Sequence, residues 1–253
     1  MRQKVRFAMI LISFLLFPIT IYYFSPVLII EGAAKGVFVG SAAVFSFMFV
    51  ISLLLGRAFC GWLCPAGGLQ ECCFGISDKR TKGGRYDLIK YLIWVPWISA
   101  IIILAIGAGG FSKINLFYQI DYGISVLDIY AYIIYYFFVG LIMILALTAG
   151  KRAFCHYVCW MAPFMVIGRK IRNLFNLPAL HLKSNNINCN KCKLCAKNCP
   201  MGLTVYEMVC AGKMENSECI LCGVCIDNCP NGSVKYAFFN SNRTVNKKED
   251  RSA

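Results

Sequence analysis

The chain has 253 residues, of which 58% are hydrophobic and only 15% are charged, and its mean hydropathy is +0.62. A soluble domain would not expose that much apolar surface, so the composition excludes an ordinary soluble protein. The formal net charge of +14 would suit nucleic-acid binding, but no nucleic-acid-binding motif is present, and the basic residues lie in short segments beside long apolar runs. The pattern therefore indicates a membrane protein.

The first apolar run extends from Phe7 to about Phe24 and follows the basic segment 1–6. It could be a cleaved signal peptide, because the small residues at 32–34 offer a cleavage site. It is longer than an ordinary signal-peptide core, however, and it continues past Pro26. We therefore expect a retained first transmembrane helix.

Three further apolar runs are long enough to cross a bilayer: Val37–Leu55, Ile89 to about Gly107, and Tyr130–Ala149. Pro96 lies inside the second of these and predicts a kink. The sequence thus predicts an α-helical membrane part of four transmembrane helices within residues 1–160.

The positive charges predict the orientation of these four spans. Lysines and arginines gather at the N-terminus, between the second and third spans, and after the fourth. The other two loops contain only Lys35 and Lys113. The positive-inside rule then predicts a multi-pass protein of the inner (cytoplasmic) membrane, with both termini in the cytoplasm. Every cysteine of the chain would lie on that same side. Reduced thiols and iron–sulfur ligands survive on that side.

An internal repeat follows the second and fourth spans. Residues 57–64 read Arg-Ala-Phe-Cys-x3-Cys, and residues 152–159 read the same. The membrane part therefore looks like two parallel copies of a helical hairpin, each of which ends in a cysteine pair.

The paired cysteines of this repeat are Cys60, Cys64, Cys155 and Cys159. Cysteines four apart share one face of a helix, and the four thiols could converge if the hairpins pack about a pseudo-twofold axis. They could then hold a further cluster or a soft metal, or form a redox-active thiol pair. The alternative is that these small cysteines simply pack the helix ends. The repeated spacing favours the redox or metal role.

Other cysteines and histidines carry weaker signals. Cys72 and Cys73 are adjacent and are interpreted as packing residues, as is Cys210. His156 lies between two of the repeated cysteines and could bind metal or carry protons, although a polar residue at the membrane surface is the simpler interpretation. His181 has no partner that the sequence identifies.

A helix is expected from Pro163 to about Phe175, because proline is favoured at the first helical position. Its apolar residues lie on one face and its basic residues elsewhere, which is typical of a helix on the inner membrane surface. We interpret residues 161–182 as this amphipathic linker.

Two motifs of the form C-x2-C-x2-C-x3-C-P follow, at residues 189–200 and 219–230. In each, three thiolates spaced three apart can bind one cluster, and the fourth reaches the other cluster. One [4Fe–4S] cluster is therefore assigned to Cys189, Cys192, Cys195 and Cys229, and a second to Cys199, Cys219, Cys222 and Cys225. Zinc sites usually present separated cysteine pairs, so the spacing fits zinc poorly. A disulfide framework fits a reducing compartment poorly.

Residues 183–238 resemble the bacterial two-cluster ferredoxins, including the prolines Pro200 and Pro230 after each motif. The resemblance implies a small α+β unit at residues 183–240 with a cluster at each end. The polar segment 241–253 is expected to be disordered.

The chain as a whole resembles the NapH/NosR/CcoG-type membrane polyferredoxins. The resemblance rests on four spans, a Cys60–Pro65 motif of the form C-x3-C-P, a related motif after the fourth span, and the two-cluster tail. The second copy departs from the pattern, because Trp160 follows its last cysteine and proline comes only at Pro163. The resemblance implies electron transfer between quinones and other redox partners, or copper reduction.

We therefore expect a membrane electron-transfer subunit, more than a stand-alone enzyme, with two [4Fe–4S] clusters and a redox protein partner. No catalytic residues are proposed, since no nucleophile–base pair, phosphate loop or dinucleotide motif is present. A quinone could bind at the aromatic third loop, although these aromatics also suit an interfacial belt: Phe111, Phe117, Tyr118 and Tyr122. A copper or iron reductase or maturation factor, and a redox sensor, are the alternatives.

Overall fold

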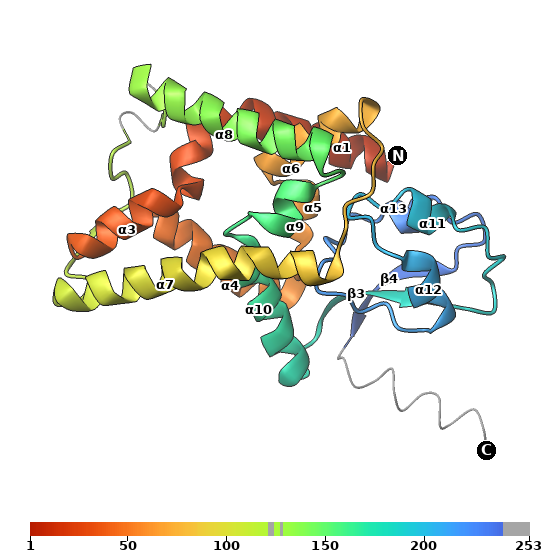
Figure 1. Ribbon diagram of the computed structural model, residues 1–253. Coiled ribbons are helices and arrows are strands. Elements are labelled where there is room, and N and C mark those ends of the chain that lie inside the picture. The colour runs from red at the N-terminus through yellow and green to blue at the C-terminus, as the bar shows by residue number, and fades with distance from the viewer. Residues whose placement is uncertain (121–123, 127–128, 240–253) are drawn as a thin grey trace.

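The computed structural model describes residues 1–120, 124–126 and 129–239. Helices occupy the part of the chain up to residue 174, and a small unit with two strands and three short helices lies beside them (Figure 1). The expected disordered segment 241–253 and Tyr122 lie outside the described residues.

The first apolar run forms a broken helix. Helix α1 (Arg2–Leu15) is followed at a bend of 59° by α2 (Phe17–Thr20) and the 3₁₀ helix η1 (Ile21–Phe24). Pro18 stands in the first turn of α2, where its missing N–H removes a bond to the preceding helix. Helix α3 (Pro26–Ala34) begins at Ser25, whose hydroxyl accepts a hydrogen bond from the Leu28 amide at 3.4 Å. The first transmembrane helix expected from Phe7 is thus broken into two segments.

The second apolar run begins as a strand. β1 (Val37–Val39) pairs in parallel with β2 (Lys113–Asn115), and α4 (Gly40–Leu55) follows directly. A side chain at Gly40 would overlap the Leu116 carbonyl, so this close approach of the two segments requires glycine. α4 therefore starts three residues later than expected, and its 16 residues fall short of the roughly 20 that cross a bilayer untilted.

Two helices are long and apolar enough to cross a membrane. They are α7 (Ile89–Gly107), which extends the 3₁₀ helix η3 (Gly84–Leu88) and continues through Pro96, and α8 (Ile129–Thr148). Both expose large apolar side chains, such as Ile103 and Phe137, to the surroundings. The bent α1–η1 segment would be a third span if its two halves cross together. The described residues thus contain two candidate spans, or three, where the sequence predicts four.

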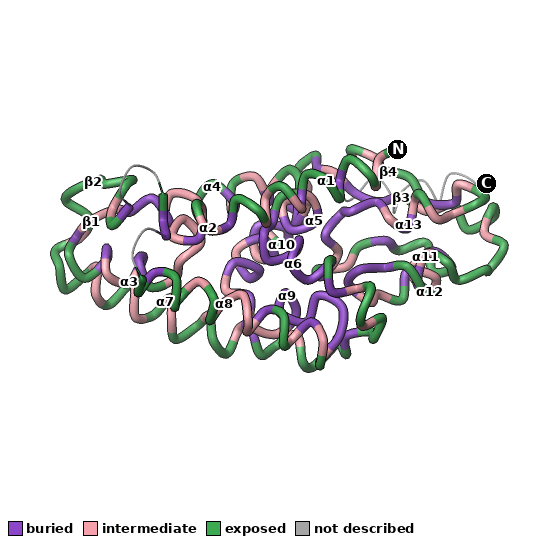
Figure 2. Tube along the Cα trace, turned by 90° about the horizontal axis from the view of Figure 1, so that it is seen from above, coloured by how far each residue is buried: buried purple, intermediate pink, exposed green. Residues whose placement is uncertain are grey.

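Between the long helices lies a set of short ones: α5 (Ala58–Trp62), α6 (Pro65–Cys72), the 3₁₀ helix η2 (Cys73–Gly75) and α9 (Ala153–Tyr157). They form the most continuously buried part of the chain (Figure 2). The long apolar helices expose their sides, whereas most residues of the short helices beside the cysteines are buried or half-buried. The protein's main core is therefore organised around the cysteine-bearing turns.

Helix α10 (Ala162–Leu174) matches the expected linker helix in position, and several of its residues are buried. It packs on α4 so closely that a side chain at Gly168 would overlap Ser52. Its basic residues Arg169 and Arg172 are buried, and Arg169 bonds to Glu215 at 2.5 Å. α10 therefore contacts the membrane part through α4 and the C-terminal unit through Glu215.

The C-terminal unit contains β3 (Ala179–Ser184), α11 (Leu194–Lys197), α12 (Val205–Cys210), α13 (Val224–Asp227) and β4 (Val234–Phe239). β3 and β4 are antiparallel, with Ala179 opposite Phe239 and Ser184 opposite Val234. This pairing brings the two ends of the unit together, and both cysteine motifs lie in the sequence between the paired strands. This is a small α+β arrangement.

Candidate iron–sulfur sites

The two C-terminal cysteine motifs have the same backbone conformation. Lys191 and Lys193 have φ near +60°, and the residues 30 positions later, Leu221 and Gly223, have φ of +49° and +75°. A short helix follows each loop directly. Left-handed residues in such loops turn successive amide N–H groups toward one side, where they form a concave surface suited to an anion. Both loops are therefore built to wrap an anionic centre.

The structure brings the eight motif cysteines together in two groups of four. One hollow is lined by Cys189, Cys192, Cys195 and Cys229. A second hollow is lined by Cys199, Cys219, Cys222 and Cys225. Each group takes three cysteines from one motif and the fourth from the other, which is the crossed arrangement typical of two-cluster ferredoxins.

The two groups differ in their exposure. Cys192 is exposed and the other three members of the first group are half-buried. In the second group Cys199, Cys222 and Cys225 are all buried. Burial and the neighbouring thiols raise the pKa of Cys222 to about 12, and burial raises that of Cys199 to about 11. These thiols would lose their protons only to a cation that binds them, as iron does.

The four cysteines of the membrane repeat also lie together. Cys60, Cys64, Cys155 and Cys159 are 2–4% exposed and share one core with the buried cysteines of the second C-terminal group. Burial first, and then the other three thiols, raise the pKa of Cys64 well above its usual range. Burial, followed by Cys155 and Cys60, raises the pKa of Cys159 to about 12. The two repeats thus contribute to one shared thiol site.

The local conformation differs from the expected helix face. α5 ends at Trp62, and Cys64 stands before α6 in an extended conformation. In both repeats the second cysteine is fixed by its amide, which bonds to a phenylalanine carbonyl: Cys64 to Phe59 at 3.1 Å and Cys159 to Phe154 at 2.9 Å. The first cysteine of each pair therefore lies in a short helix, and the second in the turn after it.

Polar and sulfur groups surround this four-cysteine site. Gln70 donates to the Cys155 sulfur at 3.3 Å, and the Cys60 thiol lies 3.8 Å from the Met165 sulfur. These contacts come from α6 and α10, which close the site on two sides.

The repeated arginines lie beside the four-cysteine site. Arg57 and Arg152 are fully buried, and the charges of both interact with Cys155. Arg152 donates to the Cys60 carbonyl and to Glu71, both at 2.5 Å. Buried cations close to thiols favour their anionic form, and they would also stabilise an anionic cluster.

Each arginine is held by a glutamate that the sequence analysis did not single out. Glu71 also pairs with Arg6 at 2.7 Å, and Glu218 bonds to Arg57 and Lys90 at 2.6 Å each. Burial raises the pKa of Glu218, but Arg57 and Lys90 outweigh it and hold that pKa at about 2. The available signal was that both acids directly precede a cysteine in a chain with only 12 acidic residues.

The four-cysteine site and the second C-terminal group are in direct contact. Gly61 lies between the cysteines of the first repeat, and a side chain there would overlap the Ile220 carbonyl. The Trp62 indole donates to the Leu221 carbonyl at 3.1 Å. Gln3 donates to the carbonyl of Cys222 at 3.1 Å. Two cysteine systems that are distant in sequence are thereby joined loop to loop.

His156 lies at the same junction. Its Nδ1 is 2.6 Å from Asp87 and its Nε2 is 3.1 Å from the Met201 carbonyl. Asp87, His156 and Glu218 are close enough to share a metal ion. However, the two oxygens of Glu218 already bond to Arg57 and Lys90, so this group is better explained as an ion-pair network.

The remaining candidates lie apart from these sites. Cys72 and Cys210 are exposed, and Cys73 is buried but lines neither cysteine hollow. His181 has a partner after all, since its Nδ1 is 3.3 Å from Glu215.

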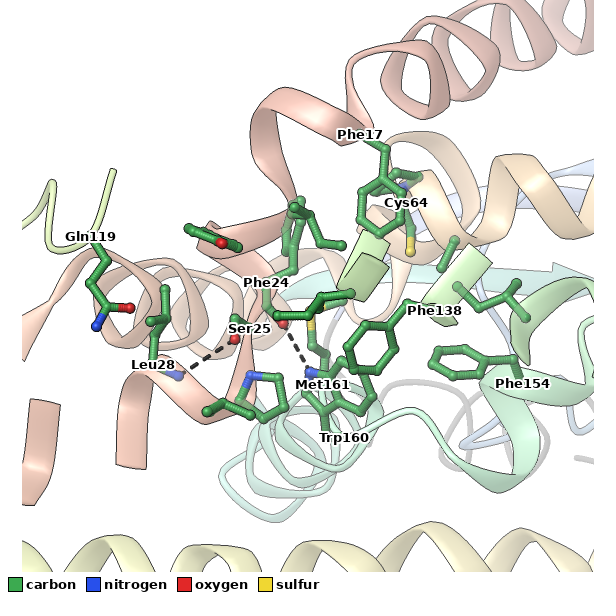
Figure 3. Close-up of a pocket in the computed structure, with 18 of the residues that line it drawn as sticks. Phe17, Phe24, Ser25, Leu28, Cys64, Gln119, Phe138, Phe154, Trp160 and Met161 are labelled. Atoms are coloured by element: carbon green, nitrogen blue, oxygen red, sulfur yellow. Dashed lines mark hydrogen bonds between the residues drawn. The ribbon is translucent and has the colours of Figure 1, made fainter. Parts of the chain in front are cut away.

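An apolar cavity adjoins the four-cysteine site (Figure 3). It lies between the bent first segment and α8, and Cys64 and Trp160 line one end. Glu31 and Gln119, which bond to each other at 2.8 Å, line the opposite, polar end. Of the four aromatic residues expected to serve a quinone, the three described ones do not line this cavity.

These sites define an iron–sulfur protein built on membrane-type helices. Comparison with known families gives the same class: the 4Fe-4S binding domain matches residues 37–83 and 131–178, which are the two membrane repeats. The chain is similar to proteins of the NapH/NosR polyferredoxin type, which confirms the resemblance inferred from its sequence.

Three curated relatives support this. An uncharacterised protein of Methanocaldococcus jannaschii is 31% identical over 165 residues, 62% of this chain and 64% of its own. Escherichia coli YccM, named for an inferred electron-transport role, is 25% identical over 63% of this chain and 46% of its own length. The regulatory protein NosR of Stutzerimonas stutzeri is 26% identical over 58% of this chain and 20% of its own length. The chain thus spans less than two thirds of each relative's length. No solved structure matches it.

Proposed function

We propose that this protein transfers electrons along three centres, from the membrane to the surface of its C-terminal unit. The observation that carries the proposal is the contact of Gly61 with Ile220, which joins the four-cysteine site to the second C-terminal cysteine group. Electron transfer needs centres placed close together in a buried medium, and this contact provides such a junction. The iron–sulfur clusters supply the redox chemistry, while the protein supplies ligands, orientation and burial.

The ligand sets support two [4Fe–4S] clusters in the C-terminal unit. Cys189, Cys192, Cys195 and Cys229 would hold the outer one, and Cys199, Cys219, Cys222 and Cys225 the inner one. Both hollows are lined by four thiols and by loops that turn amides inward. The inner group is buried and the outer group reaches the surface, which suggests the order of transfer.

A third cluster is proposed at Cys60, Cys64, Cys155 and Cys159. Its support is the match of a 4Fe-4S binding domain to both repeats and the convergence of four buried thiols beside two buried arginines. A cluster with four thiolates is anionic, and Arg57 and Arg152 provide compensating charge where water cannot.

The electron donor in the membrane is proposed to be a quinol. Oxidation of a quinol releases two electrons and two protons, so its site needs an apolar body, a polar end and a nearby electron acceptor. The cavity in Figure 3 has aromatic walls, with Gln119 at one end and Cys64 at the other. Gln119 also bonds to Glu31, which lines the same cavity. This arrangement suits a flat, apolar carrier better than the third-loop aromatics do.

The orientation is part of the same proposal. Four spans, with α4 and the bent first segment each crossing the inner membrane, would place both termini and all cysteines in the cytoplasm. The lysines and arginines of the alternate segments support this orientation.

One observation favours a second candidate. The Cys60 thiol lies 3.8 Å from the Met165 thioether, and sets of thiolate and thioether ligands select copper(I). In that case the four-cysteine site would reduce or pass copper instead of holding a cluster. Metal analysis of protein prepared with both iron and copper present would separate the two candidates.

The test of the main proposal is reduction by a quinol. Anaerobic protein in lipid nanodiscs would be mixed with a reduced quinol analogue, and cluster reduction followed by electron paramagnetic resonance. Reduction that is lost on Phe138→Ala plus Trp160→Ala in the cavity walls, with unchanged iron content, is the expected result. Failure of any quinol to reduce clusters that dithionite reduces would contradict the quinone part.

A further inference from the structure

Among the described residues, the outer cysteine group is the only one of the three that contains a fully exposed cysteine. Cys192 is exposed, whereas the four-cysteine site and three members of the inner group are buried. If electrons travel along these centres, as proposed above, a partner meets the chain most closely at the outer group. The side chains around Cys192 therefore decide which partner fits.

These surroundings are strongly basic. Lys191, Lys193 and Lys197 belong to the outer motif and are all exposed. None of them forms an ion pair in the described part of the chain; Lys193 only lies over the Tyr206 ring, 5.4 Å from its centre. Arg80 reaches the same place from another segment and donates to the Ala196 carbonyl. We call these four residues the lysine face.

A groove crosses the lysine face. Arg80, Lys193 and Lys197 line it together with Thr204 and Tyr206, and Glu207 is its only acidic residue. Leu194 adds an exposed apolar side chain next to Cys192. A basic rim around a small apolar centre is the usual composition of a docking site for a transient, oppositely charged partner.

The inner motif supplies an internal comparison. It has the same backbone, yet the positions equivalent to the three lysines hold Leu221, Gly223 and Asp227. The loop conformation therefore does not require lysine. Lys191 and Lys193 even stand at left-handed φ, which non-glycine residues rarely adopt, so a purely structural role would favour glycine there as at Gly223.

We propose that the lysine face is the docking site of an acidic redox protein that exchanges electrons with the outer centre. Each encounter transfers one electron between the outer centre and the partner, and no atoms are exchanged. The positive charges would speed the encounter by attraction at long range, and this attraction weakens as salt increases.

The test uses the full chain, loaded with iron and sulfide and purified anaerobically in detergent. Its binding to a small acidic flavodoxin is measured across a range of salt concentrations. The test variant is K191E/K193E/K197E, and the matched control is K4E/K170E/K213E, which alters three exposed lysines elsewhere. Both variants lower the net charge from +14 to +8. Iron content checks that both still assemble.

We expect binding to weaken steeply as the salt concentration rises. The test variant should bind about tenfold more weakly than the wild type, and the control should differ from the wild type by less than about twofold. Equal loss in both variants would overturn the proposal, because net charge alone would then explain binding. So would equally tight binding of the basic protein cytochrome c. Displacement of flavodoxin by millimolar inorganic phosphate at constant ionic strength would assign the face to a small anion instead.

This experiment is independent of the quinol test. The flavodoxin binds or fails to bind whether or not a quinol reduces the clusters, and dithionite can supply the electrons for a parallel measurement of transfer. Loss of quinol reduction with intact lysine-face binding would count against the proposed donor only.

Discussion

Gly61 lies directly against the carbonyl oxygen of Ile220, with no space for a side chain between them. The contact joins a turn of the membrane part to the loop that carries Cys219 and Cys222. The Trp62 indole reinforces it by donating to the next carbonyl, that of Leu221. Because glycine has no Cβ, these two cysteine-bearing turns approach backbone to backbone, which shortens the path between their thiols.

The first prediction tests this contact. Gly61→Ala would push the two turns apart, because the opposing atom belongs to a backbone that cannot rotate away. We expect reduction of the C-terminal clusters by a membrane donor to slow about tenfold or more, while their iron content stays normal. Gly75→Ala is the matched control, since nothing lies within 4 Å of the added carbon. Equal rates in the two variants would show that the contact has no role in transfer.

The second prediction concerns the four membrane-end cysteines. Cys60→Ser and Cys155→Ser come from different repeats, but both thiols lie in the same core and both raise the pKa of Cys64. Each change should therefore have a similar effect on transfer, and the double variant should be little worse than either single one. The measurement is the rate of cluster reduction by native membranes. Cys72→Ser, at an exposed cysteine outside the site, should leave the rate unchanged. Effects that multiply in the double variant would mean independent roles.

The third prediction is the iron count. Anaerobically purified protein should contain about twelve irons and as many sulfides if all three sites hold [4Fe–4S] clusters. Replacing the four membrane-end cysteines by serine should leave about eight, because the C-terminal ligands are complete without them. Zinc in place of iron would contradict all three assignments, and eight irons before and after replacement would leave the membrane-end site without a cluster.

The fourth prediction is topological. A reporter active only in the cytoplasm should work when fused after Ala253, and one fused in the loop at Lys113 should not. The physical reason is the concentration of lysine and arginine in the alternate segments. The opposite pattern would invalidate the four-span orientation and the reducing environment assumed for the cysteines.

The sequence anticipated the features that depend on local spacing. The C-x2-C-x2-C motifs, the repeat at Cys60 and Cys155, and the helices at Ile89 and Tyr130 follow from residue periodicity, and the structure has helices and clustered thiols there. Periodicity did not predict that Val37–Val39 would pair with the distant Lys113–Asn115, because strand pairing depends on tertiary contacts. It also missed the bend at Leu16, although Pro18 was available as a signal.

The same limit applies to the sites. Spacing alone predicted that Cys60 and Cys64 share a helix face, and this was wrong, because α5 ends at Trp62 and Cys64 lies in an extended conformation before α6. The buried partners Glu71 and Glu218 were also missed. A charged residue is placed in a core by partners from distant segments, here Arg6, Arg57 and Lys90, and no local pattern encodes that pairing.

The last prediction concerns Glu218, which connects the membrane part to the loop of Cys219. Its carboxylate bonds to the buried Arg57 and Lys90, so Glu218→Gln would leave two buried cations without a counter-charge. Breaking such a buried pair typically costs about 3–5 kcal/mol. We expect the docked C-terminal unit to become accessible to protease at lower denaturant concentration, with its iron content retained at first.

The control for this change is Asp227→Asn, which removes the ion pair with Arg2 at the other contact between the two parts. Both partners there are 33% exposed, so the loss should be within about 1 kcal/mol. A similar effect of the two substitutions would contradict the special role of the buried pair.

The pH dependence of the docked state gives the same prediction a second measurement. The Glu218 pKa is lowered in the folded protein from its usual value to about 2, so the folded state binds this proton less readily than the unfolded chain does. The stabilisation is therefore complete above about pH 4.5 and is lost as the pH falls toward 2. Protease accessibility of the wild type, followed between pH 6 and pH 3, should rise with acid. In Glu218→Gln, which has no such carboxyl, accessibility should be high at pH 6 and should change less over that range. An equally steep acid response in both proteins would assign the acid sensitivity to other groups and would remove Glu218 as the residue that holds the two cysteine systems together.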